Sequence, residues 1–326
     1  MHQSSTSQPR TSAWIISITL EFVAILISLL FVVGVVVEDR FLLTQWLSWI
    51  PPVVPLLVAL LAAAGVLLLR RKRWRFAVAV QLFLACAASV WLVPTGFGFT
   101  HPLVESPTQI RILQWNTNYP AGDDPDSMQA LAQSPADIVL ISNRGAITSP
   151  EQVRRWAADD ARVFGAGPFA IITSLPVVES RQVASAGVGF DRWFVGLFTV
   201  MPPAWNGRPL RIAMVDLPSR PMLSRVAVAE SLREGLLRGN LGEVDMVVGD
   251  FNAITGSVIL SRCFSNFHDA ATQGSSGWIA TWPRRFPMWQ IDHLLLSPSL
   301  RCEGAWTIDP KTSKHRMTMA VIIPVQ

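Results

Sequence analysis

Residues 282–293 read Trp-Pro-Arg-Arg-Phe-Pro-Met-Trp-Gln-Ile-Asp-His, and this stretch does most to decide the fold. Two shorter segments accompany it, Gly-Asp-Phe-Asn at 249–252 and Ser-Lys-His-Arg at 313–316. Each of the three borders an apolar run that is typical of a buried strand. Polar side chains that project from strand ends are held by a rigid backbone, which a catalytic site requires. We therefore expect an α/β domain with a site at its strand ends.

From residue 109 onward the pattern is that of one large α/β domain. Strand-like apolar runs occupy residues 110–115, 137–142, 169–173, 193–200, 210–215, 244–248, 291–296 and 318–323. Helical patterns cover residues 126–133, 150–159 and 223–238. Many strands with few intervening helices predict two sheets packed face to face with helices outside, while the pattern alone leaves a doubly wound sheet open.

The region before this domain is strongly apolar. The chain has 326 residues and a mean hydropathy of +0.36, which an ordinary soluble domain does not reach. Apolar runs cover residues 13–37, 50–69 and 76–93, and each is near the ~20 residues that a helix needs to cross a bilayer. A cleaved signal peptide is the alternative for the first run, but its apolar core is too long and no cleavage site follows. We predict three transmembrane helices.

Basic residues predict the orientation of these helices. A basic cluster follows the second apolar run, made of Arg70, Arg71, Lys72, Arg73 and Arg75. Such clusters stay in the cytoplasm. Residues 1–12 would then be a cytoplasmic tail, and residues 95–108 a linker to a periplasmic or extracellular domain, 109–326. Glu21 is the one ionisable residue inside a predicted span, and it either has a function or reaches the interface.

The sequence indicates few binding partners. The lipid bilayer is the one partner that the hydropathy predicts. The net charge of +4 comes largely from the basic cluster, and basic and aromatic residues are little interleaved elsewhere, so nothing indicates nucleic acid. Arg284 and Arg285, between Trp282 and Trp289, are the one such group near the motifs and by default form a surface loop. The oligomeric state is not indicated. Cys263 and Cys302 either form a disulfide or are buried free thiols.

Together the motifs G-D-F-N, T-W-P…I-D-H and S-x-H-R resemble the endonuclease/exonuclease/phosphatase superfamily, which contains the deoxyribonuclease-I-like nucleases. The Trp115-Asn116 end of the first strand resembles the opening motif of that superfamily. With three leading spans, the chain is similar to its membrane-anchored bacterial branch. The resemblance implies a four-layer α/β sandwich, hydrolysis of phosphate esters, and Mg²⁺ or Mn²⁺ as cofactor.

The resemblance also implies roles for individual residues. Asp292 would orient His315, which would act as general acid/base or contact the phosphate. Asp250, Asn252 and Asn116 would position water, phosphate or metal. His293 follows Asp292 directly and points to the opposite face of the strand, so we expect it to be structural.

Three positions depart from the superfamily pattern. Asn143 stands where the principal metal-binding Glu is expected, Asp216 where a phosphate-contacting His is expected, and Lys314 where the motif has Asp. An uncharged amide and an added lysine predict poor binding of Mg²⁺. We hypothesise that Lys314 replaces the metal charge and pairs with Asp216 or a bound anion. The family's phosphate-contacting Tyr has no candidate, since the chain's one Tyr is Tyr119.

A shifted alignment is the alternative, in which Asp245, Glu179 or Asp191 supplies the missing ligand. Two functions stay open at this stage. One is a membrane-anchored phosphoesterase on the outer side of the membrane with a degraded metal site. The other is an inactive family member that serves as a binding or scaffolding domain. The substrate of the first would be a nucleic acid, a phospholipid head group or a small phosphate ester.

Overall fold

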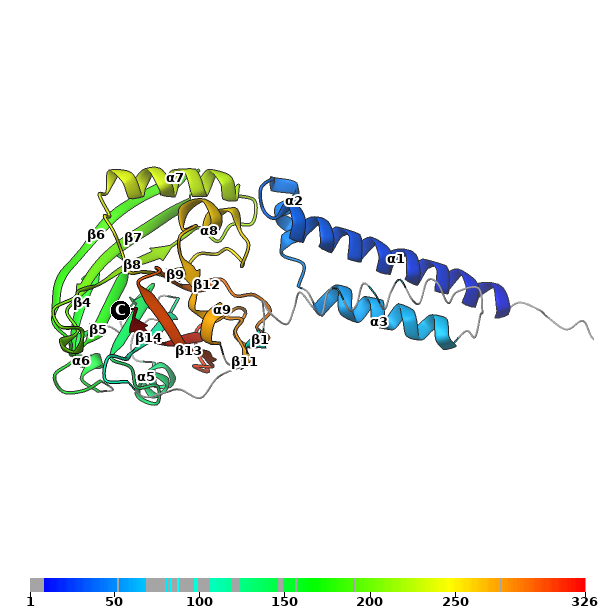
Figure 1. Cartoon of the computed structure of the whole chain (residues 1–326). Coiled ribbons are helices and arrows are strands. Elements are labelled where there is room, and N and C mark those ends of the chain that lie inside the picture. The colour runs from blue at the N-terminus through cyan, green and yellow to red at the C-terminus, as the bar shows by residue number, and fades with distance from the viewer. Residues whose placement is uncertain are drawn as a thin grey trace, which may run out of the picture. The chain divides into compact units, whose positions relative to one another are not determined.

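The computed structural model describes residues 9–51, 53–68, 80, 83, 87, 97–98, 106–118, 124–145, 149–155, 157–189, 191–275 and 277–325. Residues 1–39 and 43–94 form one compact unit, and residues 40–42 and 95–326 form another. The helices of the first region are α1 (Pro9–Val37), α2 (Leu42–Ser48) and α3 (Val53–Leu68), as labelled in Figure 1.

Helices α1 and α3 coincide with the first two apolar runs, and they pack against each other. Among the described residues no single helix is long and apolar enough to cross a membrane, although Glu21–Val37 and Leu42–Ser48, joined at a bend of 113°, pass together by length and composition. Apart from residues 80, 83 and 87, the third run lies outside the described residues. The three spans therefore remain predictions.

The second unit contains two six-stranded sheets and one small two-stranded sheet. The first sheet has the order β10-β12-β9-β8-β7-β6, from His268–Asp269, Asp292–Leu296, Met246–Asp250, Leu210–Asp216, Asp191–Val200 and Val177–Val188. The second has the order β13-β14-β2-β3-β5-β4, from Leu300–Ile308, Met317–Pro324, Ile110–Asn116, Ile138–Ser142, Phe169–Thr173 and Arg162–Ala166. The small sheet pairs β1 (Phe97–Gly98) with β11 (Gly277–Trp278). Both large sheets are mixed, since each contains one parallel pair, β8 with β9 and β2 with β3.

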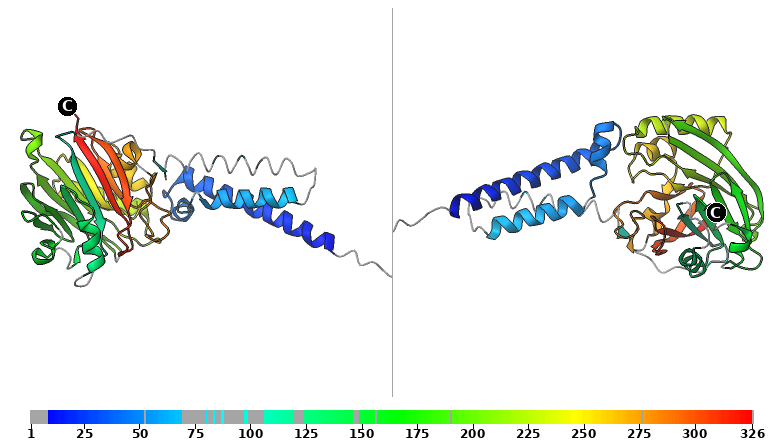
Figure 2. Two further views of the ribbon diagram at one scale, coloured as in Figure 1. Left: turned by 90° about the horizontal axis from the view of Figure 1, so that it is seen from below. Right: turned by 180° about the vertical axis from the view of Figure 1, so that it is seen from behind.

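Three hydrophobic clusters show how these layers pack. The largest lies between the two sheets and includes Ile112, Met214 and Val248. A second lies under α7 (Arg225–Arg238) and α8 (Val258–Cys263), and a third lies under α5 (Pro125–Ala132). Figures 1 and 2 show α7 along one face of the first sheet. Helices therefore flank two packed sheets, as the four-layer α/β sandwich requires, and the doubly wound alternative is wrong.

Most of the predicted elements are present, and the differences are local. All eight predicted strands are present, to within two residues at their ends. The short helix α6 (Pro150–Val153) ends well before residue 159, and Arg154 and Arg155, which follow it, are exposed. The remaining short elements are α9 (Ala270–Gly274) and a 3₁₀ turn at Pro203–Trp205.

Candidate active site

The alternation of side chains along the central strands builds the site. In β8 and β9 the residues Met214 and Val248 face the core between the sheets, and the next inward positions are Asp216 and Asp250. Strand β12 runs antiparallel to β9, so Asp292 begins it at the place where β9 ends. Asp216 is the Cα partner of Asp250, which is the partner of Asp292. Three neighbouring strands thus carry a row of three carboxylates at one end of the sandwich.

The second sheet faces this row with amides and a histidine. Asn116 ends β2, Asn143 follows β3, and His315 precedes β14, which is antiparallel to β2. The amide of Asn116 donates to Asp250 Oδ2 at 2.8 Å, and the Asn143 amide donates to Asn116 Oδ1 at 3.2 Å. The site therefore joins the two sheets at the end where their apolar core stops.

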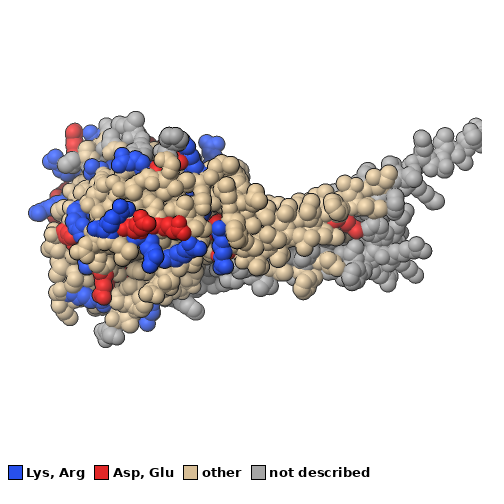
Figure 3. Space-filling view, turned by 90° about the horizontal axis from the view of Figure 1, so that it is seen from above, with Lys and Arg blue, Asp and Glu red and all other residues tan. Residues whose placement is uncertain are grey.

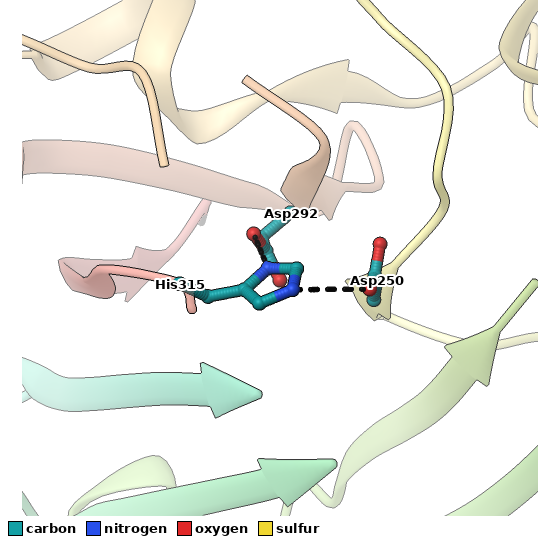
Figure 4. Close-up of side chains that lie close together, drawn as sticks. All are labelled: Asp250, Asp292 and His315. Atoms are coloured by element: carbon teal, nitrogen blue, oxygen red, sulfur yellow. Dashed lines mark hydrogen bonds and ion pairs between the residues drawn. The ribbon is translucent and has the colours of Figure 1, made fainter. Parts of the chain in front are cut away.

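His315 is held between two of the carboxylates, as Figure 4 shows. Its Nδ1 lies 2.9 Å from Asp292 Oδ2, and its Nε2 lies 3.8 Å from Asp250 Oδ2. The three side chains are almost completely buried, with 6% exposure for His315, 0% for Asp292 and 3% for Asp250. Because Nδ1 is engaged by a carboxylate, it carries a proton, and Nε2 is the nitrogen left to exchange one.

Electrostatics in this cluster favour a charged imidazole. Burial alone would lower the pKa of His315, but the carboxylate of Asp292, its hydrogen bond, and the carboxylates of Asp250 and Asp216 outweigh burial and raise the pKa to about 9. Burial, and then the neighbouring Asp250, raise the pKa of Asp216. Burial, and then Asp292, raise the pKa of Asp250. The cluster therefore holds more negative charge than its one histidine neutralises.

Local backbone features hold the motif residues in place. Gly249 has φ +144°, and a Cβ there would lie 1.9 Å from the Val215 carbonyl oxygen, so β8 and β9 can approach only at a glycine. After Asp250, the backbone N–H of Asn252 donates to Asp250 Oδ1 at 2.9 Å. The Asn252 amide itself donates to the Leu217 carbonyl at 2.8 Å. Asn252 thus ties together the ends of β8 and β9.

The residues present fit a divalent cation. Asp250, Asp292 and His315 each offer one ligand atom, and these atoms lie within 4.8 Å of one another. Among the described residues the buried Oδ1 of Asn143 has no hydrogen-bond partner. An oxygen-rich set with surplus negative charge suits Mg²⁺ or Mn²⁺ rather than a soft metal.

The predicted pairing of Lys314 with Asp216 is wrong, and its pairing with a bound anion stays a prediction. The Lys314 side chain is exposed, and in the described part of the chain it forms no ion pair with Asp216. Its contribution to the site is its backbone carbonyl, which accepts from Arg284 N at 2.8 Å. Arg284 also donates to the Ser313 carbonyl and to Asp309, so it supports the segment that carries His315.

The shifted-alignment alternative is also wrong. Asp245, Glu179 and Asp191 each form an ion pair with an arginine, at 3.3, 2.8 and 3.1 Å. None of them belongs to the group that could hold a metal within the described residues. Asn143 and Asp216, in contrast, lie at the site, and the Asn143 side chain hydrogen-bonds Asp216.

Two supporting residues were not predicted. Gln114 is fully buried on β2, two positions before Asn116, and its amide lies 3.4 Å from Asp292 Oδ1. Thr281 Oγ1 accepts from the backbone N–H groups of Ile291 and Asp292, each at 3.3 Å. The polar Gln114 inside an apolar strand was a usable signal, because it shares the inward face with Ile112 and Asn116. Thr281 gave no such signal.

The structure also tests the predictions for His293 and for the two cysteines. His293 faces the cluster under α7 and α8, where its ring meets that of Phe251 edge-on at 5.4 Å, so its predicted structural position is confirmed. Cys263 and Cys302 are free thiols, and they pack in different hydrophobic clusters. Tyr119 lies outside the described residues.

Comparison with known proteins agrees with this architecture. The model of the endonuclease/exonuclease/phosphatase family matches residues 63–314, more than half of the chain, so this chain belongs to that family. A family protein from Bacteroides thetaiotaomicron superposes with a TM-score of 0.51 at 15% identity, over 68% of this chain and 100% of the other. A mannosyl-6-phosphatase from B. thetaiotaomicron VPI-5482 gives a TM-score of 0.51 at 14% identity, over 66% and 99%. At these identities the structures show the shared fold. No curated protein matches the chain.

Proposed function

We propose that this chain is a phosphoesterase in which His315 is the general acid/base. The observation that carries the proposal is the placement of His315 between Asp292 and Asp250 at the strand ends of both sheets. Asp292 holds Nδ1 and so fixes the tautomer and the ring orientation. The Nε2 makes no hydrogen bond among the described residues, so it can protonate a leaving oxygen or hydrogen-bond a phosphoryl oxygen.

Other side chains would position the reactants. Asp250 lies opposite Nε2 and can accept a proton from an attacking water. Asn116 supports Asp250, and Asn252 fixes the turn that carries it. When bound, a divalent cation would neutralise charge on the phosphate and lower the pKa of a bound water. Among the residues that would hold it are Asp250 and the amide oxygen of Asn143.

The test is hydrolysis of bis(p-nitrophenyl) phosphate by the full chain in detergent, with and without Mn²⁺. We expect metal-dependent turnover that His315→Asn abolishes. A matched control is His268→Asn, because His268 pairs with Leu296 at the far end of β12 from Asp292. Equal turnover by wild type and the His315 variant would refute the assignment of His315.

Membrane anchoring is the second part of the proposal. Three apolar runs and the basic loop between the second and third support an integral membrane protein with a cytoplasmic N-terminus and an outer catalytic domain. Figure 3 shows that the described helices of the first unit present few charged side chains, whereas the second unit carries acidic and basic side chains interspersed. Reporter fusions after residues 40, 72 and 108 test the topology. An active cytoplasmic reporter at 108 would contradict it.

One observation favours a different function, that of a non-catalytic binding domain. An asparagine occupies position 143, where the family pattern places a carboxylate. Such a domain would bind a phosphate ester through His315 and the amides without cleaving it. The double reversion Asn143→Glu with Lys314→Asp separates the two functions. Turnover that appears only in the revertant supports the binding domain, and turnover in the wild type supports the enzyme.

A further inference from the structure

Asp216 has no assigned role in the reaction just proposed, yet it lies in the row of carboxylates. It is the Cα partner of Asp250 on the parallel strand β8, so both side chains leave the sheet on the same face. Asp292 in the same row is engaged by His315 at 2.9 Å. Of the three carboxylates, Asp292 is therefore the one that His315 engages closely. Asp216 and Asp250 are the other two.

The amide of Asn143 approaches these carboxylates from the other sheet. Its side chain hydrogen-bonds Asp216 and donates to Asn116 Oδ1, the residue that bonds Asp250. Asn143 is 8% exposed, and its Oδ1 has no partner among the described residues. A buried amide oxygen without a donor costs free energy unless a cation or water completes its contacts. Here it belongs to a side chain that already touches Asp216.

No basic side chain balances this arrangement. In the part of the chain that the structure describes, no lysine or arginine forms an ion pair with Asp216 or Asp250, and Lys314 is exposed. The side chains that approach these carboxylates from the other sheet are the imidazole of His315 and the amides of Asn116 and Asn143.

We infer that Asp216 is a ligand of a divalent cation, which it shares with Asp250 and the Oδ1 of Asn143. This inference deepens the proposed function, since it names the carboxylate that replaces the one missing at position 143. The set is made of oxygens alone, which suits Mg²⁺ or Mn²⁺ and leaves His315 bound to Asp292. Asp216 thus compensates for Asn143 across the gap between the sheets, instead of repelling the substrate.

The experiment measures Mn²⁺ binding by calorimetry and by electron paramagnetic resonance, on the full chain in detergent. We expect one site in the wild type and at least about a tenfold weaker affinity in Asp216→Asn, because affinity for hard cations follows the number of charged ligands. Glu179→Gln is the matched control. It removes a carboxylate from the same sheet, on the edge strand β6, where Glu179 pairs with Arg181 at 2.8 Å. Its affinity should equal that of the wild type.

A second variant keeps the inference testable if Asp216→Asn does not fold. Asn143→Asp adds a carboxylate of the same shape, and aspartate tolerates the φ of +53° found at this position. We expect Asn143→Asp to bind Mn²⁺ at least about tenfold more tightly, and to restore binding when combined with Asp216→Asn. Thermal unfolding without metal checks that each variant folds.

The outcomes separate this inference from the proposed function. Undetectable Mn²⁺ binding in the wild type, or equal binding in the wild type and Asp216→Asn, overturns the inference even if the phosphodiester is hydrolysed. Binding that depends on Asp216 without any hydrolysis supports the inference and overturns the proposed enzyme.

Discussion

Among the described residues of the second unit, the buried histidines His293 and His315 differ in what surrounds their second nitrogen. The Nδ1 of each lies beside a carboxylate, at 2.6 Å from Asp269 for His293 and at 2.9 Å from Asp292 for His315. The Nε2 of His293 lies 2.8 Å from the carbonyl oxygen of Ala253, whereas the nearest carboxylate to the Nε2 of His315 is Asp250, at 3.8 Å. His293 and Asp269 form a closed pair, in which both ring nitrogens have partners within the fold. His315 and Asp292 form an open pair, in which Nε2 is left for a ligand.

The protonation states follow from these contacts. A carbonyl oxygen accepts only, so the Nε2 of His293 carries a proton, and its Nδ1 donates to Asp269. Burial would lower the pKa of His293, but the hydrogen bond that it donates to Asp269 outweighs burial and raises the pKa. Both ring nitrogens of His293 thus have partners within the fold. Its neighbour Asp292 lies on the opposite face of the same strand. Adjacent residues of β12 therefore belong to the two different histidine pairs.

The largest expected effect is on catalysis, in a variant that removes His315 from the open pair. His315→Ala should lower kcat by about 10²–10⁴-fold, the usual contribution of a general acid/base. Stopped-time hydrolysis of the phosphodiester with Mn²⁺ gives the rate. The free energy of unfolding should fall as well, because the fully buried Asp292 carboxylate loses the partner of its hydrogen bond. A kcat within a factor of a few of the wild type would contradict the comparison.

How much of the fold was predictable depends on where a strand lies in its sheet. Central strands such as β2, β3, β8 and β9 are buried on both faces, and their apolar runs predicted them. The strands that the sequence did not predict include β4, β6 and β13, which are edges of the two sheets. The edge strand β6 reads Val-Val-Glu-Ser-Arg-Gln-Val-Ala-Ser-Ala-Gly-Val, with mixed exposure. An edge strand faces solvent on one side, so it needs no continuous apolar pattern.

The site was predictable where a residue's direction follows from strand alternation. Asp250 and Asp292 were found by their motifs, and alternation correctly separated Asp292 from His293. Lys314 lies in a turn, where alternation gives no direction, and its predicted pairing with Asp216 was wrong. The contact of Gln114 with Asp292 joins the two sheets, and such a contact between distant parts of the chain cannot be read from local pattern.

The second effect is on stability, in a variant that removes His293 from the closed pair. His293→Ala should lower the free energy of unfolding by about 3–5 kcal/mol, because it leaves the Asp269 carboxylate without its buried partner. Urea unfolding of the full chain in detergent, followed by tryptophan fluorescence, measures the loss. Glu179→Gln, which removes a partly exposed ion pair with Arg181, serves as control and should lose markedly less. Equal losses in the two variants would contradict the argument from burial.

A smaller effect is expected from a change that keeps the shape of the open pair. Asp292→Asn should lower kcat by about ten- to a hundredfold, as is usual for a residue that orients a reactive group. The Asp292 carboxylate is the main charge that raises the pKa of His315 toward about 9. The basic limb of the pH–rate profile should therefore move to lower pH in the variant. A limb that stays in place would assign it to another group.

The smallest expected effect concerns the residues that hydrogen-bond the aspartate of each pair. Thr281 accepts from the backbone of Asp292, and Gln290 donates to Asp269 Oδ2 at 2.9 Å. Either Thr281→Val or Gln290→Met should cost about 1 kcal/mol of unfolding free energy, since each removes ordinary hydrogen bonds from a buried place. Only Thr281→Val should also slow the hydrolysis, by a few-fold, because it loosens the strand end that orients His315. If Gln290→Met slows hydrolysis equally, the closed pair also shapes the reactive site, and the division between the two histidines is incomplete.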